Sequence, residues 1–179
     1  MVDAQVDDAF LLAAAQDGDV DAFEALVRRH QAAVFRVALR MLGSRADAQD
    51  ATQETFVRAW RALPAFRRQS AVSTWLYRIV TRRCLDLITS RRLTAGLDEL
   101  DFASDSDPVQ ATEERERLRA VTRAIAALPG EQRAALVLRE FEGLAYQEVA
   151  DVLGTSLAAV KGRIHRARLA VIEQIRGWE

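Results

Sequence analysis

Residues 143–156 read Gly143-Leu144-Ala145-Tyr146-Gln147-Glu148-Val149-Ala150-Asp151-Val152-Leu153-Gly154-Thr155-Ser156, and the pattern runs on into residues 157–168. The apolar residues between 149 and 153 form one face of a short helix, and Gly154 is a natural C-terminal stop. Thr155 or Ser156 can cap the helix that follows. With so few residues between them, the two helices must cross sharply. The stretch therefore predicts a helix-turn-helix, a motif that presents its second helix to the major groove of DNA.

The second helix of this motif has two unlike faces. At about 100° per residue, a core stripe forms from Val160, Ile164, Ala167 and Val171. The opposite face is small and basic, and it consists of Ala158, Lys161, Gly162, His165, Arg166 and Leu169. A solvated charged face is the alternative interpretation, but the preceding helix, the glycine turn and the cap favour a surface that reads DNA.

Length and composition favour a folded, helical protein. The 179 residues suit one domain or two small ones, and 50% hydrophobic with 28% charged residues allow buried cores and argue against disorder. Alternating β-branched runs bounded by turn residues do not occur, whereas Ala, Leu, Arg and Glu recur at helical spacing. The predicted fold class is all-α.

The distribution of charge is more informative than the net charge of -1. Residues 58–92 carry many arginines against the single acid Asp86, whereas the charged residues of 97–116 are all acidic except Arg115. The recognition helix is basic again and holds Lys161, the only lysine of the chain. This order predicts two small helical domains that face DNA, joined by an acidic linker. The expected bounds are 7–92 for the first domain, 93–111 for the linker, and 112–179 for the second domain, which ends in the helix-turn-helix.

Cysteine usage and hydropathy bear on the cellular compartment. Cys84 is the only cysteine, which excludes an internal disulfide and a cysteine-based zinc site. The N-terminal residues are acidic and lack a signal-like pattern, and no apolar run approaches the roughly 20 residues that a membrane span needs. We therefore expect a soluble, cytoplasmic protein without membrane insertion.

The first half begins with two scaffold helices: a short apolar one, predicted at residues 10–16 and broken by Asp17-Gly18-Asp19, and an amphipathic one, predicted at residues 20–42 and ended by Gly43-Ser44. His30 lies in the second of them without a metal-ligating partner at a suitable spacing, so we expect a structural histidine. No metal site and no cofactor are predicted.

A third helix, predicted at residues 47–63, has an acidic face. Asp47, Asp50 and Glu54 recur at steps of three and four, with Gln53 beside them. Taken alone, this pattern is more typical of a solvated surface than of a binding site.

A loop at residues 65–73 then opens onto a fourth helix, predicted at residues 74–88. We expect its arginines, together with Thr74 and Tyr77, to point outward, and its packing face to consist of Leu76, Ile79, Val80, Cys84 and Leu87. Aromatic rings interleaved with arginines can bind single-stranded nucleic acid, because each stacked base contributes about 1–3 kcal/mol. Burial of Trp75 in the core is the alternative. Further helices are predicted at residues 112–127 and 131–141.

Taken together, these segments resemble the extracytoplasmic-function group of bacterial sigma factors, the small members of the sigma-70 family. The resemblance covers about residues 7–177. It rests on four motifs in order, which are residues 47–61, residues 73–79, Leu128-Pro129 with Arg133, and residues 142–168.

The resemblance implies an RNA polymerase sigma factor that recognises the -10 and -35 promoter elements and opens the promoter, with core RNA polymerase and promoter DNA as partners. An anti-sigma factor is a further implied partner. The polymerase-docking surface would be Asp47, Asp50, Gln53 and Glu54. The -10 surface would be Phe66, Arg68, Ser70, Ser73, Thr74, Trp75, Tyr77, Arg78, Arg82 and Arg83. The -35 surface would be Lys161, Gly162, His165 and Arg166, with Arg139 and Tyr146 on phosphates.

Two departures from the family pattern bear on promoter choice. Arg82 stands where asparagine is frequent, and Gly162 stands where serine is frequent. The alternative function is a stand-alone helix-turn-helix regulator, although a basic, aromatic segment in the first half has no purpose in a sensor domain. An enzyme is disfavoured, because paired histidines, a Gly-rich phosphate loop and a buried carboxylate cluster do not occur in the sequence.

Overall fold

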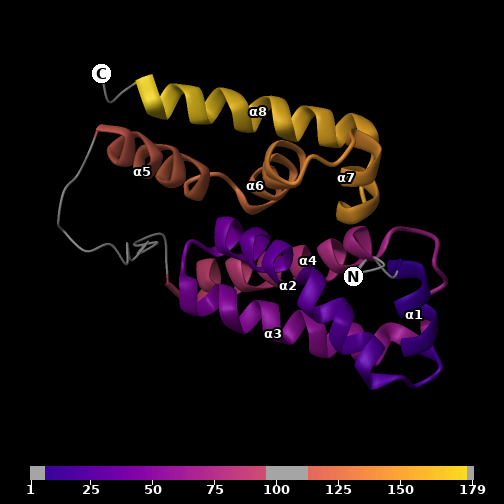
Figure 1. Cartoon of the computed structure of the whole chain (residues 1–179). Helices are drawn as coiled ribbons and strands as arrows, with labels where there is room; N and C mark the ends of the chain where they lie inside the picture. The colour runs from indigo at the N-terminus through magenta and orange to yellow at the C-terminus, as the bar shows by residue number, and fades with distance from the viewer. Residues whose placement is uncertain (1–6, 96–112, 177–179) are drawn as a thin grey trace.

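The computed structural model describes residues 7–95 and 113–176, and these residues are all-α. They form two helical groups, one lying over the other (Figure 1). The lower group contains α1 (Asp8–Gln16), α2 (Val20–Leu42), α3 (Arg45–Ala62), a 3-10 turn (Leu63–Ala65) and α4 (Val72–Ala95). The upper group contains α5 (Glu113–Ala126), α6 (Gly130–Leu136), a π-helical segment (Val137–Phe141), α7 (Tyr146–Leu153) and α8 (Leu157–Arg176). Most of the expected acidic linker, residues 96–111, lies outside the described residues.

α2 is the central helix of the lower group, and its observed bounds are those predicted. Asp19 caps its N-terminus, since the Oδ1 of Asp19 accepts a hydrogen bond from the backbone N–H of Ala22 at 3.1 Å. It ends at Gly43, which adopts a left-handed conformation with φ 71°. Its buried face includes Val34 and Val37 and packs against α3 and α4.

α4 is longer than predicted, and two of its residues that were expected to be exposed are buried. Leu76, Val80 and Cys84 are buried, as expected from the apolar pattern. Thr74 and Tyr77, however, are each only 8% exposed, so the prediction that they point outward was wrong. α4 packs against α6 and α7 of the upper group, and a local sequence pattern cannot reveal such a distant neighbour.

The upper group contains the predicted helix-turn-helix. α7 ends at Gly154, which has φ 60°, and α8 begins after Ser156. Of the two candidate caps, Ser156 is the one used, since its Oγ accepts a hydrogen bond from the N–H of Ala159 at 3.1 Å. The core stripe of α8 is confirmed, because Val160 and Ile164 are almost fully buried.

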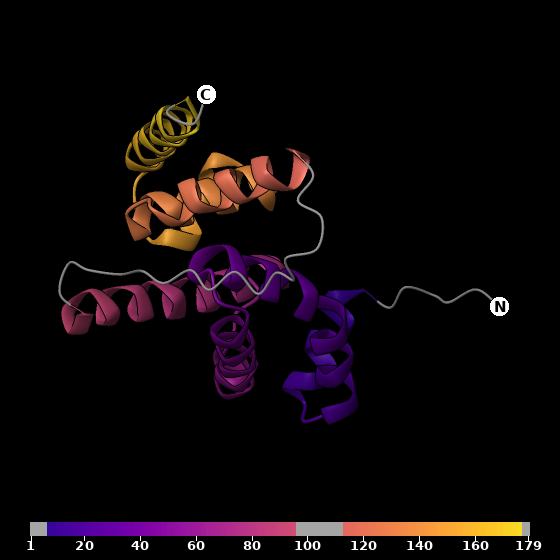
Figure 2. The same ribbon diagram turned by 90° about the vertical axis from the view of Figure 1, so that its left-hand side faces the viewer.

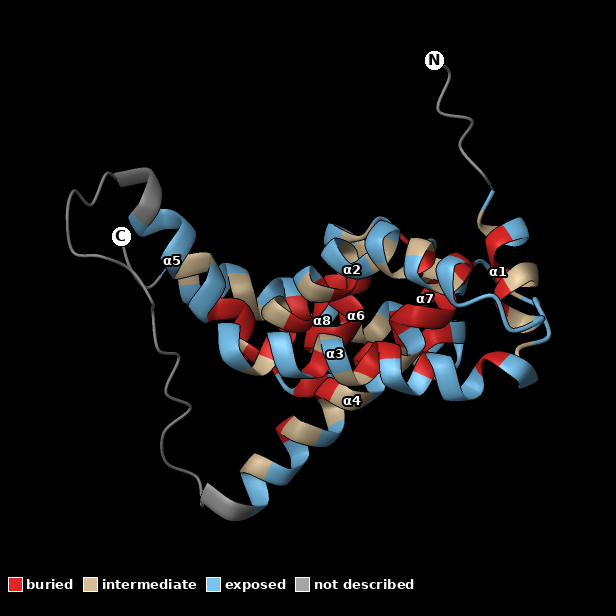
Figure 3. Cartoon of the chain, turned by 60° about the horizontal axis from the view of Figure 1, so that its bottom comes forward, coloured by how far each residue is buried: buried red, intermediate tan, exposed pale blue. Residues whose placement is uncertain are grey.

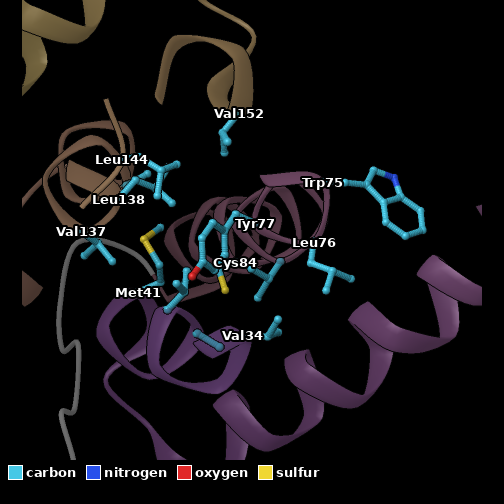
Figure 4. Close-up of a cluster of buried hydrophobic side chains, with 14 of the residues drawn as sticks. Val34, Met41, Trp75, Leu76, Tyr77, Cys84, Val137, Leu138, Leu144 and Val152 are labelled. Carbon is cyan, nitrogen blue, oxygen red and sulfur yellow. The ribbon is translucent and has the colours of Figure 1, made fainter. Parts of the chain in front are cut away.

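The two groups share one hydrophobic core. The view at 90° to the first shows the upper group resting on α2 and α4 (Figure 2). Buried residues concentrate where these helices meet α6 and α7 (Figure 3). In the close-up, Met41 and Tyr77 of the lower group lie beside Val137, Leu138 and Leu144 of the upper group (Figure 4). The residues on each side therefore depend on the other group for their burial.

Arg133 is the polar centre of this junction. It is 2% exposed, and its guanidinium donates to the carbonyl oxygens of Met41 in the lower group and of Ala126 and Leu128 in the upper group. Burial lowers the pKa of Arg133 to about 10, so the side chain remains charged at neutral pH. One buried cation thus satisfies carbonyls at the C-terminal ends of both α2 and α5.

Glu142 forms a second polar contact between the groups. Its side chain is 4% exposed and accepts hydrogen bonds from Arg40 at 3.2 Å and from the Tyr77 hydroxyl at 3.0 Å. Arg36 lies 3.8 Å away. Burial, followed by the charge and the hydrogen bond of Glu142, raises the pKa of Tyr77 to about 12. We call Glu142 with Arg36, Arg40 and Tyr77 the junction cluster.

None of the described helices is long and apolar enough to span a membrane.

Candidate nucleic-acid and polymerase interfaces

A cavity of about 690 Å³ lies beside the loop that joins the 3-10 turn to α4. The rings of Phe66 and Trp75 line it and stack on each other, with centroids 4.4 Å apart and planes inclined by 21°. Arg67 and Arg78 also line this cavity. An aromatic wall with arginines beside it is suited to an unstacked base and its phosphate. We refer to this site as the loop cavity.

The opposite wall of the loop cavity comes from the helix-turn-helix. It consists of Ala150, Asp151, Gly154 and Thr155, at the end of α7 and in the turn that follows. The sequence could not indicate this wall, because it depends on how the two helical groups pack together. The cavity is thus bordered by both groups in this arrangement.

The residues predicted to contact the -10 element separate into three sets. Phe66, Ser70, Trp75 and Arg78 line the loop cavity, and Arg82 is exposed further along α4. Arg68 and Arg83 bind side chains of the protein itself, and Ser73 is half-buried at the start of α4. Thr74 and Tyr77 are buried, with the Tyr77 hydroxyl bonded to Glu142. The interpretation of Trp75 as a core residue is also partly right, since the residue is 8% exposed and its ring is stacked on Phe66.

The acidic face of α3 is divided between paired and unpaired side chains. Asp47 forms an ion pair with Arg91 at 2.6 Å, and Glu54 forms one with Arg83 at 2.5 Å. Partial burial would raise the pKa of Asp47, but hydrogen bonds from Arg91 and Ser44 and the charge of Arg91 outweigh it, so the pKa lies below its usual value. Asp50 and Gln53 are exposed. The free edge of this face is therefore at Asp50 and Gln53, between two carboxylates that also tie α3 to α4.

The outer face of α8 is basic and accessible. Arg163 and Arg168 form ion pairs with Glu131 and Glu140, which lie elsewhere in the upper group. Lys161, His165 and Arg166 are exposed and form no ion pair with any described residue. The paired arginines hold α8 in place, and the unpaired side chains are left for a ligand.

Gly162 lies under the side chain of Arg166. A Cβ at position 162 would be 3.3 Å from Arg166 Nη1. The guanidinium of Arg166 therefore folds back over the preceding turn of α8, as helix geometry favours for long side chains. Gly162 leaves that space open.

Arg139 and Tyr146 form an internal brace before α7. Arg139 Nη1 donates a hydrogen bond to the carbonyl oxygen of Leu144 at 2.7 Å, and its guanidinium lies 4.6 Å from the centroid of the Tyr146 ring. Both side chains are half-buried. These contacts hold the turn that leads into the helix-turn-helix, a role that the sequence did not indicate for them.

Two further residues were missed in the sequence. Glu142 is the carboxylate of the junction cluster, and Gln16 of α1 forms hydrogen bonds with the loop beside the cavity. A glutamine in a scaffold helix carries no sequence signal for such a role. Within residues 7–95 and 113–176, no group of three or more metal-ligating side chains occurs.

Comparison with known proteins assigns both halves of the chain. Residues 26–94 match the family described as Sigma-70 region 2, and residues 118–171 match Sigma-70, region 4. The ECF RNA polymerase sigma factor SigE of Mycolicibacterium smegmatis is 38% identical over 151 residues, covering 82% of this chain and 58% of its own length. The RNA polymerase sigma-H factor of Pseudomonas aeruginosa is 36% identical over 181 residues, covering 93% of each chain.

Solved structures agree on the fold. The structure of CnrH in complex with the cytosolic domain of CnrY matches with a TM-score of 0.73 and 32% identity, covering 95% of this chain and 97% of that one. The sigma factor RpoE of Bartonella quintana, solved with the anti-sigma factor NepR, matches with a TM-score of 0.73 and 22% identity, covering 88% of this chain and 98% of that one. By its two family matches and its relatives, the chain belongs to the sigma-70 family of RNA polymerase sigma factors, in the extracytoplasmic-function group.

Proposed function

We propose that the two helical groups divide promoter recognition between them: the lower group docks on core RNA polymerase and captures the -10 element, and the upper group reads the -35 element. The domain bounds proposed for this division are residues 7–92 and 112–179, with residues 93–111 as the linker. The observation that carries the proposal is the loop cavity, with its Phe66–Trp75 stack and neighbouring arginines. A stand-alone regulator has no need of such a site.

Capture of the -10 element would use the loop cavity. A base that leaves the DNA stack loses stacking energy, and the aromatic surface of Phe66 and Trp75 offsets part of that loss. Arg78 lines the cavity and Arg82 is exposed on α4, so both are available to phosphates of the opened strand.

Reading of the -35 element would use the outer face of α8. Arg166 can donate two hydrogen bonds to a guanine edge, while Lys161 and His165, one turn apart, would contact neighbouring positions. The small residues Ala158 and Gly162 lie on the same face and allow close approach to the groove.

Docking on the polymerase would use the acidic face of α3, with Asp50 and Gln53 as its accessible edge. The protein would work in the cytoplasm as an initiation factor without catalytic residues of its own. An anti-sigma factor is a proposed regulator, supported by the complex of the structural relative RpoE with NepR.

Run-off transcription with purified core polymerase tests the proposed function. We expect core polymerase plus this chain to initiate at a cognate promoter, and the chain alone to bind the same duplex weakly at physiological salt. Each group offers only a few base contacts, so tight binding requires both groups to be held on the polymerase. Tight, specific binding by the chain alone, with no transcription upon addition of core polymerase, would favour the stand-alone regulator.

A further inference from the structure

The side-chain amide of Gln16, the last residue of α1, uses its full hydrogen-bonding capacity on one loop. Its Nε2 donates to the carbonyl oxygens of Leu63 at 3.0 Å and Phe66 at 2.7 Å. Its Oε1 accepts from Nε and Nη2 of Arg68 at 3.1 Å and 2.8 Å. An amide has two donor hydrogens and two acceptor lone pairs, so all four are engaged. This set of partners also fixes which end of the amide is nitrogen.

The segment that Gln16 holds is the one that shapes the loop cavity. Leu63 begins the 3-10 turn after α3, and Phe66 provides the ring that stacks on Trp75. Arg68 has φ 55°, and among the described residues it is the one residue other than glycine with a positive φ. A left-handed arginine costs on the order of 1 kcal/mol and persists only where its surroundings hold it. Gln16 provides these contacts on both sides of Phe66, through Leu63 before it and Arg68 after it.

α1 is itself packed firmly against the lower group, so the position of Gln16 is fixed. Leu11 and Leu12 are buried, and Asp8 contacts α2 through an ion pair with Arg29 and a 2.6 Å contact with His30 Nε2. Gln16 lies before residue 26, where the match to Sigma-70 region 2 begins. The segment that matches this family therefore does not include α1.

We propose that Gln16 is a positioning residue that sets the shape of the loop cavity and thereby tunes which base is accepted there. This inference rests on the proposed function, in which the cavity receives a base of the -10 element. Gln16 does not line the cavity. It acts through the backbone carbonyl of Phe66, while the Phe66 ring is held by Trp75.

Gln16→Glu is the sharpest test, because it keeps the size of the side chain and changes its hydrogen bonding. The ionised carboxylate has no donor for the carbonyl oxygens of Leu63 and Phe66, but it still accepts hydrogen bonds from Arg68. Gln16→Met is the second variant; it removes all four hydrogen bonds without adding charge. Gln31→Glu, the same chemical change at an exposed position of α2, is the matched control.

The full-length variants are assayed with core polymerase on a promoter library randomised in the -10 element, on duplex templates and on templates premelted across that element. For Gln16→Glu and Gln16→Met we expect transcription from the duplex template to fall about tenfold, since both variants lose at least the two hydrogen bonds to the carbonyl oxygens of Leu63 and Phe66. Base preference should change at one -10 position, transcription from the premelted template should fall less, and core binding should stay within about twofold. Gln31→Glu should match the parent protein in every readout.

Two outcomes separate the inference from the proposed function. If Trp75→Ala alters the -10 preference and both Gln16 variants lose transcription without altering it, Gln16 serves stability only and the inference is wrong. If Trp75→Ala also leaves the preference unchanged while the protein still folds and binds core polymerase, the loop cavity is not the -10 site and the proposed function fails there. Should Gln16→Glu fail to fold, Gln16→Met decides: an altered -10 preference supports the inference, and an unaltered one overturns it.

Discussion

Asp50 is the carboxylate on the acidic face of α3 that has no described ion-pair partner, whereas Asp47 and Glu54 are bound to arginines. We predict that Asp50→Lys lowers affinity for core polymerase at least tenfold, because a close charge pair at an interface contributes about 1.5 kcal/mol or more. The melting temperature should not change, because exposed charges contribute little to folding. Asp86→Lys, an exposed charge reversal on α4, is the control. Parental core affinity in Asp50→Lys would remove this edge from the docking surface.

Arg166 tests whether α8 reads bases. Arg166→Ala should flatten the preference at one or two -35 positions, because a bidentate contact to guanine is worth about 1–3 kcal/mol of discrimination. The measurement is transcription from a library randomised in the -35 element. A uniform loss across sequences, with preference unchanged, would make Arg166 a phosphate contact instead.

Tyr77 gives a pH dependence whose sign follows from its environment. Its pKa is raised from 10.0 to about 12, chiefly by burial and then by Glu142, so the folded state holds the proton more tightly than the unfolded state. The stabilisation is complete below pH 10 and is lost as the pH rises towards about 12. We predict that the free energy of unfolding falls more steeply across this window in the parent protein than in Tyr77→Phe, as measured by urea titration. Equal slopes would place the Tyr77 hydroxyl in a solvated environment.

At the scale of elements, the π-helical segment is the feature that periodicity could not predict. Residues 131–141 have the pattern of one helix, and the widened last turn shifts its register by only one residue. Its end makes one local contact, from Arg139 to the carbonyl oxygen of Leu144, and one contact with the lower group, from Glu142 to Arg40. The contact with the lower group is the part that a local pattern cannot carry.

The variant Arg139→Ala distinguishes a structural role of Arg139 from a contact with a DNA phosphate. As a brace, Arg139→Ala should destabilise the protein by about 1–2 kcal/mol, since a hydrogen bond from a charged donor and a partly buried ring contact are lost. Binding of the polymerase complex to all promoters should weaken, with the slope of log affinity against log salt unchanged. A slope smaller by about one charge, with stability unaffected, would identify the phosphate contact that the family resemblance implies.

Helices were predictable from the sequence where one amphipathic face meets a core, as in α2, whose caps at Asp19 and Gly43 are also local signals. α4 was predicted too short because residues 89–95 are mostly polar and carry no apolar stripe. Within the candidate site, the exposed face of α8 followed from periodicity. Tyr77, Gln16 and the α7 wall of the loop cavity did not, because their environments are made by segments far apart in the sequence.

For the whole molecule, the packing of the two helical groups restricts access to the proposed -10 site. The loop cavity is closed on one side by Asp151 and Thr155 of the helix-turn-helix, and Tyr77 is covered by the upper group. A DNA strand that enters the cavity from that side requires the two groups to move apart. The contacts that oppose this movement are the shared apolar core, Arg133 and the junction cluster.

The junction cluster can be opened at Glu142. In Glu142→Ala, Arg40 loses its ion pair and the buried Tyr77 hydroxyl loses its acceptor, at a cost of about 1–3 kcal/mol for an unsatisfied buried group. We predict a larger radius of gyration in small-angle scattering. We also predict faster reaction of a thiol reagent with Cys84, a fully buried thiol near Tyr77 and Met41 whose pKa burial raises to about 12 (Figure 4). Glu140→Ala is the matched control, because it breaks the pair with Arg168 inside the upper group alone.

Because separation of the groups also uncovers the loop cavity, Glu142→Ala should bind a single-stranded -10 oligonucleotide more tightly than the parent protein does. A variant that is as compact and as slowly labelled as the parent would show that the apolar core and Arg133 hold the groups together without Glu142.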